Sequence, residues 1–145
     1  MTMLRNDELQ ATIIAYLKSI SVIYSLLITE DNPTGLLEIR EDQWQGDNFR
    51  YPNIRVRMIS NSPFGDSDQC DASSFSASVM AYSEDASSQE ADKIAGIIST
   101  SLNAKSFIQG SVSMFLRTTS LIPAVRSDTL TWRSECLMQG IASKI

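Results

Sequence analysis

The side chains of this sequence that could do chemistry are carboxylates, serines, cysteines and arginines, because none of the 145 residues is a histidine. That absence excludes Ser–His and Cys–His nucleophile pairs, imidazole metal sites and the side chain that most often serves as a general base. The six glycines are scattered singly, so the sequence has neither a phosphate-binding loop nor a Gly-x-Ser-x-Gly turn. We therefore expect no catalytic residue, no cofactor and no enzyme activity.

Carboxylates gather at two places where a metal or acid–base site is conceivable. Asp66, Asp68 and Asp71 share one polar stretch, but the glycine and the twelfth-position glutamate of a calcium loop are missing. Glu84 and Asp85 precede a predicted helix, whose positive N-terminal end favours negative charge. We interpret the first group as a solvated acidic loop and the second as helix capping, and we predict no metal site.

The two cysteines, Cys70 and Cys136, do not make a disulfide framework in a chain of this length. Two thiols without a histidine fill only half of a tetrahedral zinc site. We expect both thiols to be reduced, with Cys70 in a loop and Cys136 buried in a strand.

The arginines are the more informative charged residues, since they make up eight of the twelve basic side chains. Three interpretations stay open, in this order: the polar face of a half-exposed sheet, a surface for a neighbouring subunit or partner, and a ring of charge around a channel for nucleic acid. The second interpretation pairs strand arginines with loop carboxylates such as Asp66, Asp68 and Asp71. Six arginines lie on or beside predicted strands: Arg50, Arg55, Arg57, Arg117, Arg126 and Arg133.

The elements that must position these side chains follow from the spacing of apolar residues. Ala91, Ile94, Ile98 and Leu102 form one helical face, preceded by Ser87 and Glu90 at the capping-box spacing. The sequence predicts helices over about 6–20, with an Asn6 or Asp7 cap, and 87–102, strands over about 36–41, 54–59, 74–83, 112–122 and 129–138, a turn over 30–35, loops over 42–48 and 60–73, and an undecided segment over 21–28.

Adjacent strands with two helices predict an α+β fold: a mainly antiparallel sheet of about four to five strands with two helices packed on one face. Pro123 interrupts the 112–122 segment, which indicates an edge strand or two pieces. We expect one domain over 1–145, because the length suits one core and we find no linker or repeat.

The net charge and the hydropathy of the sequence limit the classes of partner that we expect. The net charge of −5 and the pI of about 4.6 disfavour a general nucleic-acid binder, which normally carries a basic surplus. The N-terminus lacks the basic-then-apolar order of a signal peptide, and the apolar runs are shorter than the roughly 20 residues that cross a bilayer. We expect folding in a cytoplasm and no membrane partner.

The order of the elements resembles the tail terminator, or tail completion, proteins of tailed bacteriophages. The resemblance rests on the helix over 7–20, the Tyr51-Pro52 entry into the strand that begins Asn53-Ile54-Arg55-Val56, and the strand over 75–83 followed by the helix that starts at 89–95. The closing strands match in kind, so the resemblance covers most of the chain as a pattern of element order and length.

The resemblance implies a virion structural protein of the phage tail or neck, assembled in the host cytoplasm. Such proteins form a hexameric ring at the head-proximal end of the tail tube, end tube polymerisation and join the tail to the neck. The implied partners are further copies of the chain, the tail tube protein and a neck or connector protein, and a sheath protein is a further candidate. Genomic DNA passes through the ring without specific binding. The 42–48 and 60–73 loops are then the expected partner-facing elements.

Three other functions stay open from the sequence. The first is a head–tail connector or stopper of the neck, which is also structural. The second is a carboxylate-dependent enzyme, for which Asp66, Asp68 and Asp71 would be essential. The third is a monomeric ligand-binding domain, which requires a closed apolar pocket.

Overall fold

The computed structural model describes residues 3–46, 50–64 and 72–145. The predicted acidic residues Asp66, Asp68 and Asp71 and the thiol of Cys70 therefore lie outside the described residues. The elements in chain order are α1 (Asn6–Lys18), α2 (Ser21–Tyr24), the 3-10 turn η1 (Ser25–Leu27), β1 (Ile39–Glu41), β2 (Asn53–Pro63), β3 (Ala72–Ser83), α3 (Gln89–Leu102), β4 (Lys105–Gln109), β5 (Val112–Arg126) and β6 (Trp132–Lys144).

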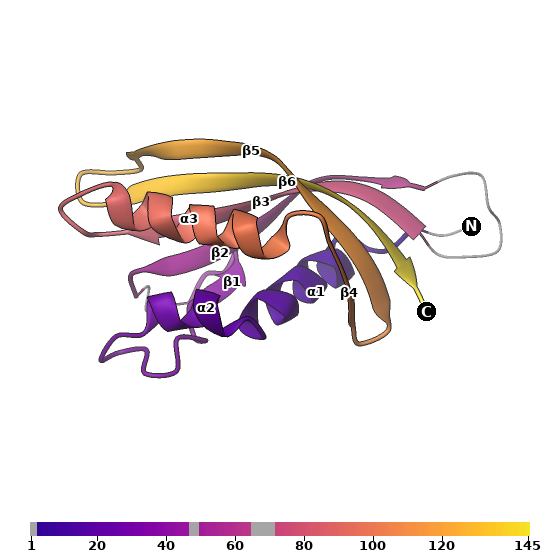
Figure 1. The fold of residues 1–145 in the computed structure, drawn as a ribbon, viewed down its shortest axis with the longest axis horizontal. Coiled ribbons are helices and arrows are strands. Elements are labelled where there is room, and N and C mark those ends of the chain that lie inside the picture. The colour runs from indigo at the N-terminus through magenta and orange to yellow at the C-terminus, as the bar shows by residue number, and fades with distance from the viewer. Residues whose placement is uncertain (1–2, 47–49, 65–71) are drawn as a thin grey trace.

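The strands form one curled sheet in the order β1-β2-β3-β6-β5-β4, and all neighbouring pairs except the parallel β1–β2 pair are antiparallel (Figure 1). The mixed α+β architecture and the mainly antiparallel pairing are as predicted. The described residues hold six strands and three α-helices, however, where the sequence predicted four to five strands and two helices. The additional elements are β4 and the short α2, both under six residues long.

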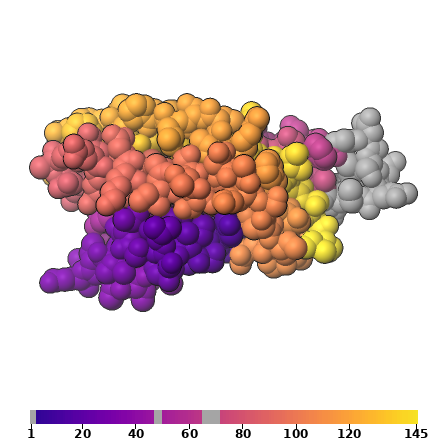
Figure 2. All heavy atoms as spheres, in the orientation of Figure 1, coloured from indigo at the N-terminus to yellow at the C-terminus, as the bar shows by residue number. Residues whose placement is uncertain are grey.

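The helices cover one face of the sheet, because each long helix carries one apolar stripe. Leu9, Ile13 and Leu17 of α1 and Ile94 and Ile98 of α3 are fully buried against the sheet. Figure 2 shows α3 and the N-terminal helices packed side by side over this face. The alternating apolar residues of β2, β3, β5 and β6 supply the other side of the core: Ile54, Val56, Phe75, Ala77, Val79, Ala81, Met114, Leu116, Cys136 and Met138.

Both predicted helix starts need correction. Helix α1 begins after Arg5, whose backbone N–H donates to Glu8, so neither Asn6 nor Asp7 is the cap. Helix α3 begins after Ser88, and Glu90 accepts a hydrogen bond of 2.7 Å from the Ser83 hydroxyl instead of closing a capping box with Ser87. Glu84 and Asp85 are exposed ahead of this helix and do not cap it.

The predicted loop over 60–73 is wrong at both of its ends, and its residues 65–71 lie outside the described part of the chain. Residues 60–63 continue β2 and residues 72–73 begin β3, with pairs such as Ser60↔Ser76 and Pro63↔Ser73. Serine-rich sequence lacks the alternation of apolar residues that predicts a strand. These residues are strands because their backbones pair with each other, which the local sequence does not show. Strand β2 therefore reaches past the predicted end at 59, and a register shift between Met58 and Ser60 marks the change.

Strand β5 is continuous through Pro123, and β6 extends to Lys144, beyond the predicted 138. Strand β4 pairs only with residues 112–116 of β5, so the remainder of β5 lies at the edge of the sheet and tolerates Pro123 near a register shift. The edge character of this segment was predicted correctly.

The undecided segment over 21–28 is helical over residues 21–27, as α2 followed by η1, and extended at Ile28. Helix α1 is fastened to β4 by the stacked rings of Tyr16 and Phe107, whose centroids lie 3.7 Å apart. Within the described residues, no single helix is long and apolar enough to span a bilayer; α1 reaches that length and composition only jointly with the Ser21–Leu27 segment, across a bend of 79°.

Candidate functional site

The face of the sheet that no helix covers, here called the uncovered face, collects most of the predicted strand arginines. Side chains alternate along a strand, so Arg55 and Arg57 of β2 point away from their buried neighbours Ile54 and Val56. The register then aligns the other residues of this face across β3, β6 and β5. Four of the six predicted arginines share it: Arg55, Arg57, Arg117 and Arg133.

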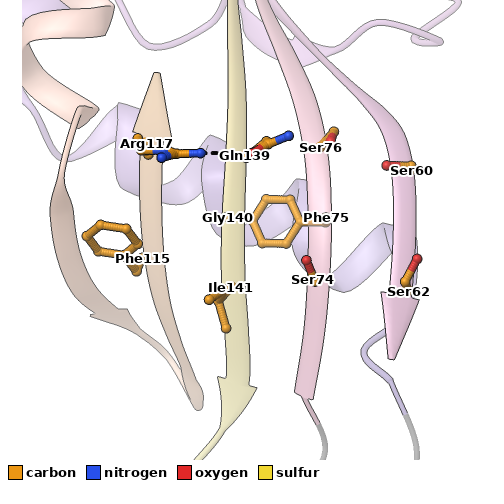
Figure 3. Close-up of a pocket in the computed structure, with 10 residues that line it drawn as sticks. All are labelled: Ser60, Ser62, Ser74, Phe75, Ser76, Phe115, Arg117, Gln139, Gly140 and Ile141. Atoms are coloured by element: carbon orange, nitrogen blue, oxygen red, sulfur yellow. Dashed lines mark hydrogen bonds between the residues drawn. The ribbon is translucent and has the colours of Figure 1, made fainter. Parts of the chain in front are cut away.

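An open hollow of about 340 Å³ lies on the uncovered face (Figure 3). Phe115 and Ile141 face each other across β5 and β6 and are 38% and 40% exposed. The guanidinium of Arg117 donates a hydrogen bond of 3.1 Å to Oε1 of Gln139 at the same hollow. Four hydroxyls line the side formed by β2 and β3: Ser60, Ser62, Ser74 and Ser76.

Two of the predicted arginines serve the interior of the chain. Glu38 is completely buried, and its carboxylate lies 3.0 Å from Arg55, 3.3 Å from Arg50 and 3.8 Å from Arg40. The guanidinium of Arg40 in turn lies 3.8 Å above the ring of Trp44, in the 42–46 part of the predicted partner-facing loop. This cluster joins β1 to β2 and stabilises the fold; residues 47–49 of the loop lie outside the described part of the chain.

Two further arginines also have partners in the chain. Arg133 lies 3.4 Å from the carboxylate of Glu135. Arg126 lies above Trp132, with 4.6 Å between guanidinium and ring centroid, and donates to the carbonyl oxygen of Thr129. Among the described residues, no carboxylate lies within ion-pairing distance of Arg57 or Arg117, which are both exposed.

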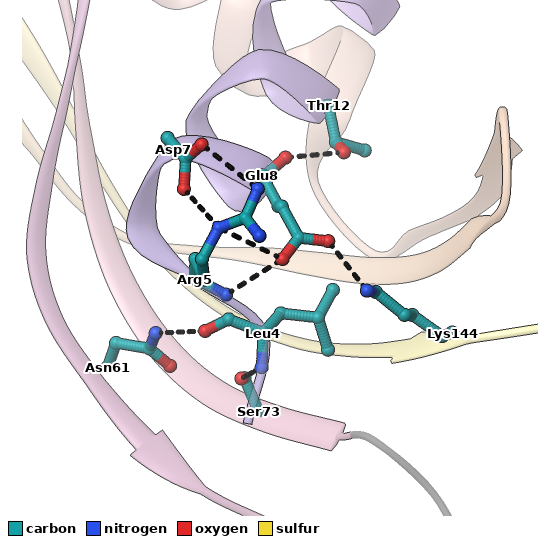
Figure 4. A network of polar contacts seen from close by, with 8 residues as sticks. All are labelled: Leu4, Arg5, Asp7, Glu8, Thr12, Asn61, Ser73 and Lys144. Atoms are coloured by element: carbon teal, nitrogen blue, oxygen red, sulfur yellow. Dashed lines mark hydrogen bonds and ion pairs between the residues drawn. The ribbon is translucent and has the colours of Figure 1, made fainter. Parts of the chain in front are cut away.

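The N-terminal polar network is structural. The backbone of Leu4 donates to the Ser73 hydroxyl at 2.8 Å and accepts from the Asn61 amide at 2.7 Å (Figure 4). Glu8 lies 3.0 Å from Nζ of Lys144, and this contact lowers the pKa of the Glu8 carboxyl, helped by the Arg5 backbone and side chain. The network ties the start of the chain to β2, β3 and β6.

Burial shifts two further titratable groups of the described residues, Cys136 and Tyr82. Burial raises the pKa of the Cys136 thiol, which is free and enclosed in β6 as predicted, so the neutral form is favoured. Burial also raises the pKa of Tyr82, with the Asp42 carboxylate adding to the shift. Within residues 3–46, 50–64 and 72–145, no three His, Cys, Asp or Glu side chains gather as a metal ion requires.

Sequence reasoning missed both the hollow and the buried carboxylate. Glu38 carried a usable signal, since an acid between Leu37 and Ile39 in a predicted strand is unusual unless it is paired. The sequence contained no signal for the hollow at Phe115 and Ile141, because these two side chains become neighbours only through the register of β5 against β6.

Comparison with known proteins yields a structural likeness. No family model matches the sequence, and no curated protein matches it. A solved chain from the virion of a native gene transfer agent particle superposes with a TM-score of 0.72. The superposition covers 93% of this chain and 94% of that chain, at 12% sequence identity. The two chains share a fold.

Proposed function

We propose that this chain is a virion structural protein, a tail terminator that forms a hexameric ring at the head-proximal end of a tail tube. The observation that carries the proposal is the shared fold with a chain of a gene transfer agent virion, which spans nearly the whole of both chains. The order and length of the elements support the finer assignment through their resemblance to tail terminators. One fold can serve several functions, so a shared fold alone does not assign a role. The second argument for the proposal comes from the uncovered face of the sheet.

The uncovered face suits contact between subunits. Aromatic and arginine side chains are enriched in protein interfaces, and this face presents Phe115, Ile141, Arg57 and Arg117 to solvent. A closed ring of identical subunits needs two different complementary patches on each copy. An open sheet face opposite a helical layer provides two unlike sides for such a contact.

The mechanism we propose involves no bond chemistry. Repeated contacts of complementary shape and charge close the ring, cap the tube and offer a surface to the neck. A net charge of −5 suits a conduit, because DNA that slides through a ring must not be gripped by its phosphates. The chain is thus proposed as a non-enzymatic assembly protein of the virion, with tube and neck proteins as partners and sheath protein as a further candidate.

Reconstitution with tail tubes tests this function. Purified chain is mixed with tube protein during polymerisation, and the products are imaged by cryo-electron microscopy. We expect six-fold rings at one end of the tubes and a narrow length distribution. Rings that bind isolated neck complexes but leave tube growth unchanged would instead assign the connector or stopper role. Binding to neither partner would reject both assignments.

A further inference from the structure

The segment between η1 and β1, here called the 28–37 loop, projects from the helical side of the molecule after α2 (Figure 1). Ile28 and Leu37 are large apolar residues that remain 50% and 45% exposed. Glu30 and Asp31 are exposed between them, and the sequence from 28 to 37 contains no basic residue. The loop thus presents an apolar and acidic surface.

Hydrogen bonds and close packing within the molecule hold the 28–37 loop in one conformation. The side chain of Asn32 is 1% exposed; its amide donates to the carbonyl of Leu27 at 3.3 Å, and its Oδ1 accepts from the backbone of Leu37 at 3.2 Å. Gly35 has a φ of +76°, and a Cβ at this position would lie 1.9 Å from the carbonyl oxygen of Tyr24. A surface loop ordered in advance loses little conformational entropy when it binds.

The hollow of the uncovered face is the chemical complement of this loop. Phe115 and Ile141 offer apolar surface. Arg117 donates to Gln139 at the hollow, and no carboxylate of the described residues lies within ion-pairing distance of its guanidinium. Within one chain the two surfaces lie on opposite sides of the sheet, because the loop follows α2 in the helical layer and the hollow is on the face that no helix covers.

We propose that the 28–37 loop of one copy docks in the hollow of the uncovered face of the next copy, with Leu37 against Phe115 and Ile141 and with Asp31 near Arg117. The contact joins two unlike patches, so it propagates head to tail and generates a ring when the rotation closes. This inference rests on the proposed ring and names the surfaces that build it.

Cross-linking between two singly labelled chains tests the contact. One chain carries Leu37→Cys, the other carries Ile141→Cys, both carry Cys70→Ser, and a short bismaleimide is added to the concentrated mixture. We expect a covalent pair of one chain of each kind, identified by mass spectrometry. The matched control replaces Ile141→Cys with Leu130→Cys, a residue that is 69% exposed in the bend between β5 and β6. Equal yields with the control, or no product, overturn the contact.

Charge reversal provides a second measurement on exposed sites that leave the core intact. By sedimentation, Asp31→Arg or Arg117→Asp alone should each weaken self-association about tenfold, and the two variants mixed or combined should restore it within about threefold. Lys93→Glu, on the exposed face of α3, should leave association unchanged. Six-fold rings that persist without the cross-link or the charge effect reject this contact and keep the ring, whereas monomers under all conditions reject both.

Discussion

At the scale of single residues, Glu38 contributes most clearly to the fold. A carboxylate removed from water is costly unless cations surround it, and Arg40, Arg50 and Arg55 all lie within 4 Å. Deleting one partner of such a cluster leaves buried charge without its compensation. The cluster also shows that an arginine on a strand can act inside a chain as readily as on its surface.

Glu38→Gln should therefore lower the free energy of unfolding by about 3 kcal/mol, as is typical for the loss of one partner of a buried ion pair. The change should be measured by urea unfolding at neutral pH. Glu84→Gln removes the same charge from an exposed position and should change stability by less than about 0.5 kcal/mol. Similar effects of both variants would show that Glu38 does not stabilise the fold.

The Glu8–Lys144 contact predicts a dependence of stability on pH. The pKa of Glu8 is lower in the folded chain than in the unfolded chain, because Lys144 favours the charged carboxylate. The contact therefore stabilises the fold above about pH 4.3, the ordinary pKa of a glutamate, and this contribution is lost as the pH falls through the lowered value.

Lys144→Gln should consequently lower the melting temperature at neutral pH, and the difference from the wild type should shrink in acid. Thermal unfolding followed between about pH 3 and about pH 7 measures it. Lys105→Gln, an exposed change in β4, serves as the control. A difference that stays constant over this range would contradict the role of the ion pair.

At the scale of elements, the glycines of β6 and α3 differ in whether the structure has room for a larger side chain. A Cβ on Gly140 would lie 2.5 Å from the ring of Phe75 and 2.8 Å from the carbonyl oxygen of Phe115, so β6 needs the small residue to pack between β3 and β5. A Cβ on Gly96 would meet nothing within 4 Å. The first glycine is required by packing, whereas the second only weakens its helix.

Gly140→Ala should lower the free energy of unfolding by about 1–3 kcal/mol through overpacking. Gly96→Ala should raise it by about 0.5–1 kcal/mol, since alanine favours a helix interior. Chemical denaturation of the two variants side by side gives both signs. A stable Gly140→Ala variant would mean that β3 and β5 can move apart at no cost.

At the scale of the whole molecule, charge is segregated. The chain carries a net charge of −5, yet the uncovered face presents Arg57 and Arg117 to solvent. The charged residues of the 28–37 loop, in contrast, are all acidic. Unlike charges on two sides of one molecule favour ordered head-to-tail contact and disfavour contact between like sides.

Self-association should therefore weaken with salt. Raising the ionic strength from about 0.1 M to about 1 M shortens the Debye length from about 10 Å to about 3 Å and screens the facing charges. Sedimentation should show a rising apparent dissociation constant over this range. An association that tightens with salt would indicate a contact made by apolar surface alone.

Much of the fold could be predicted because local patterns report burial directly. The alternation of Ile54, Val56 and Met58 and the helical stripe from Ala91 to Leu102 each require one apolar face, and the predicted strand and helix are both present, although β2 is longer and α3 begins later than predicted. Strand β4 and residues 60–63 of β2 could not be predicted, since their strand state depends on backbone partners elsewhere in the chain. The six arginines were singled out because they lie on or beside predicted strands, but the sequence did not show which of them would be buried and which exposed.

The sequence by itself determined an α+β chain without histidine chemistry, with arginines on strands and acids in loops, because residue type and local period are properties of the chain alone. Only the tertiary structure decided that Arg55 is buried on Glu38, that Arg117 stays exposed, and that Phe115 meets Ile141. Those outcomes depend on strand register and on which face the helices cover, and both are set by contacts between residues distant in sequence.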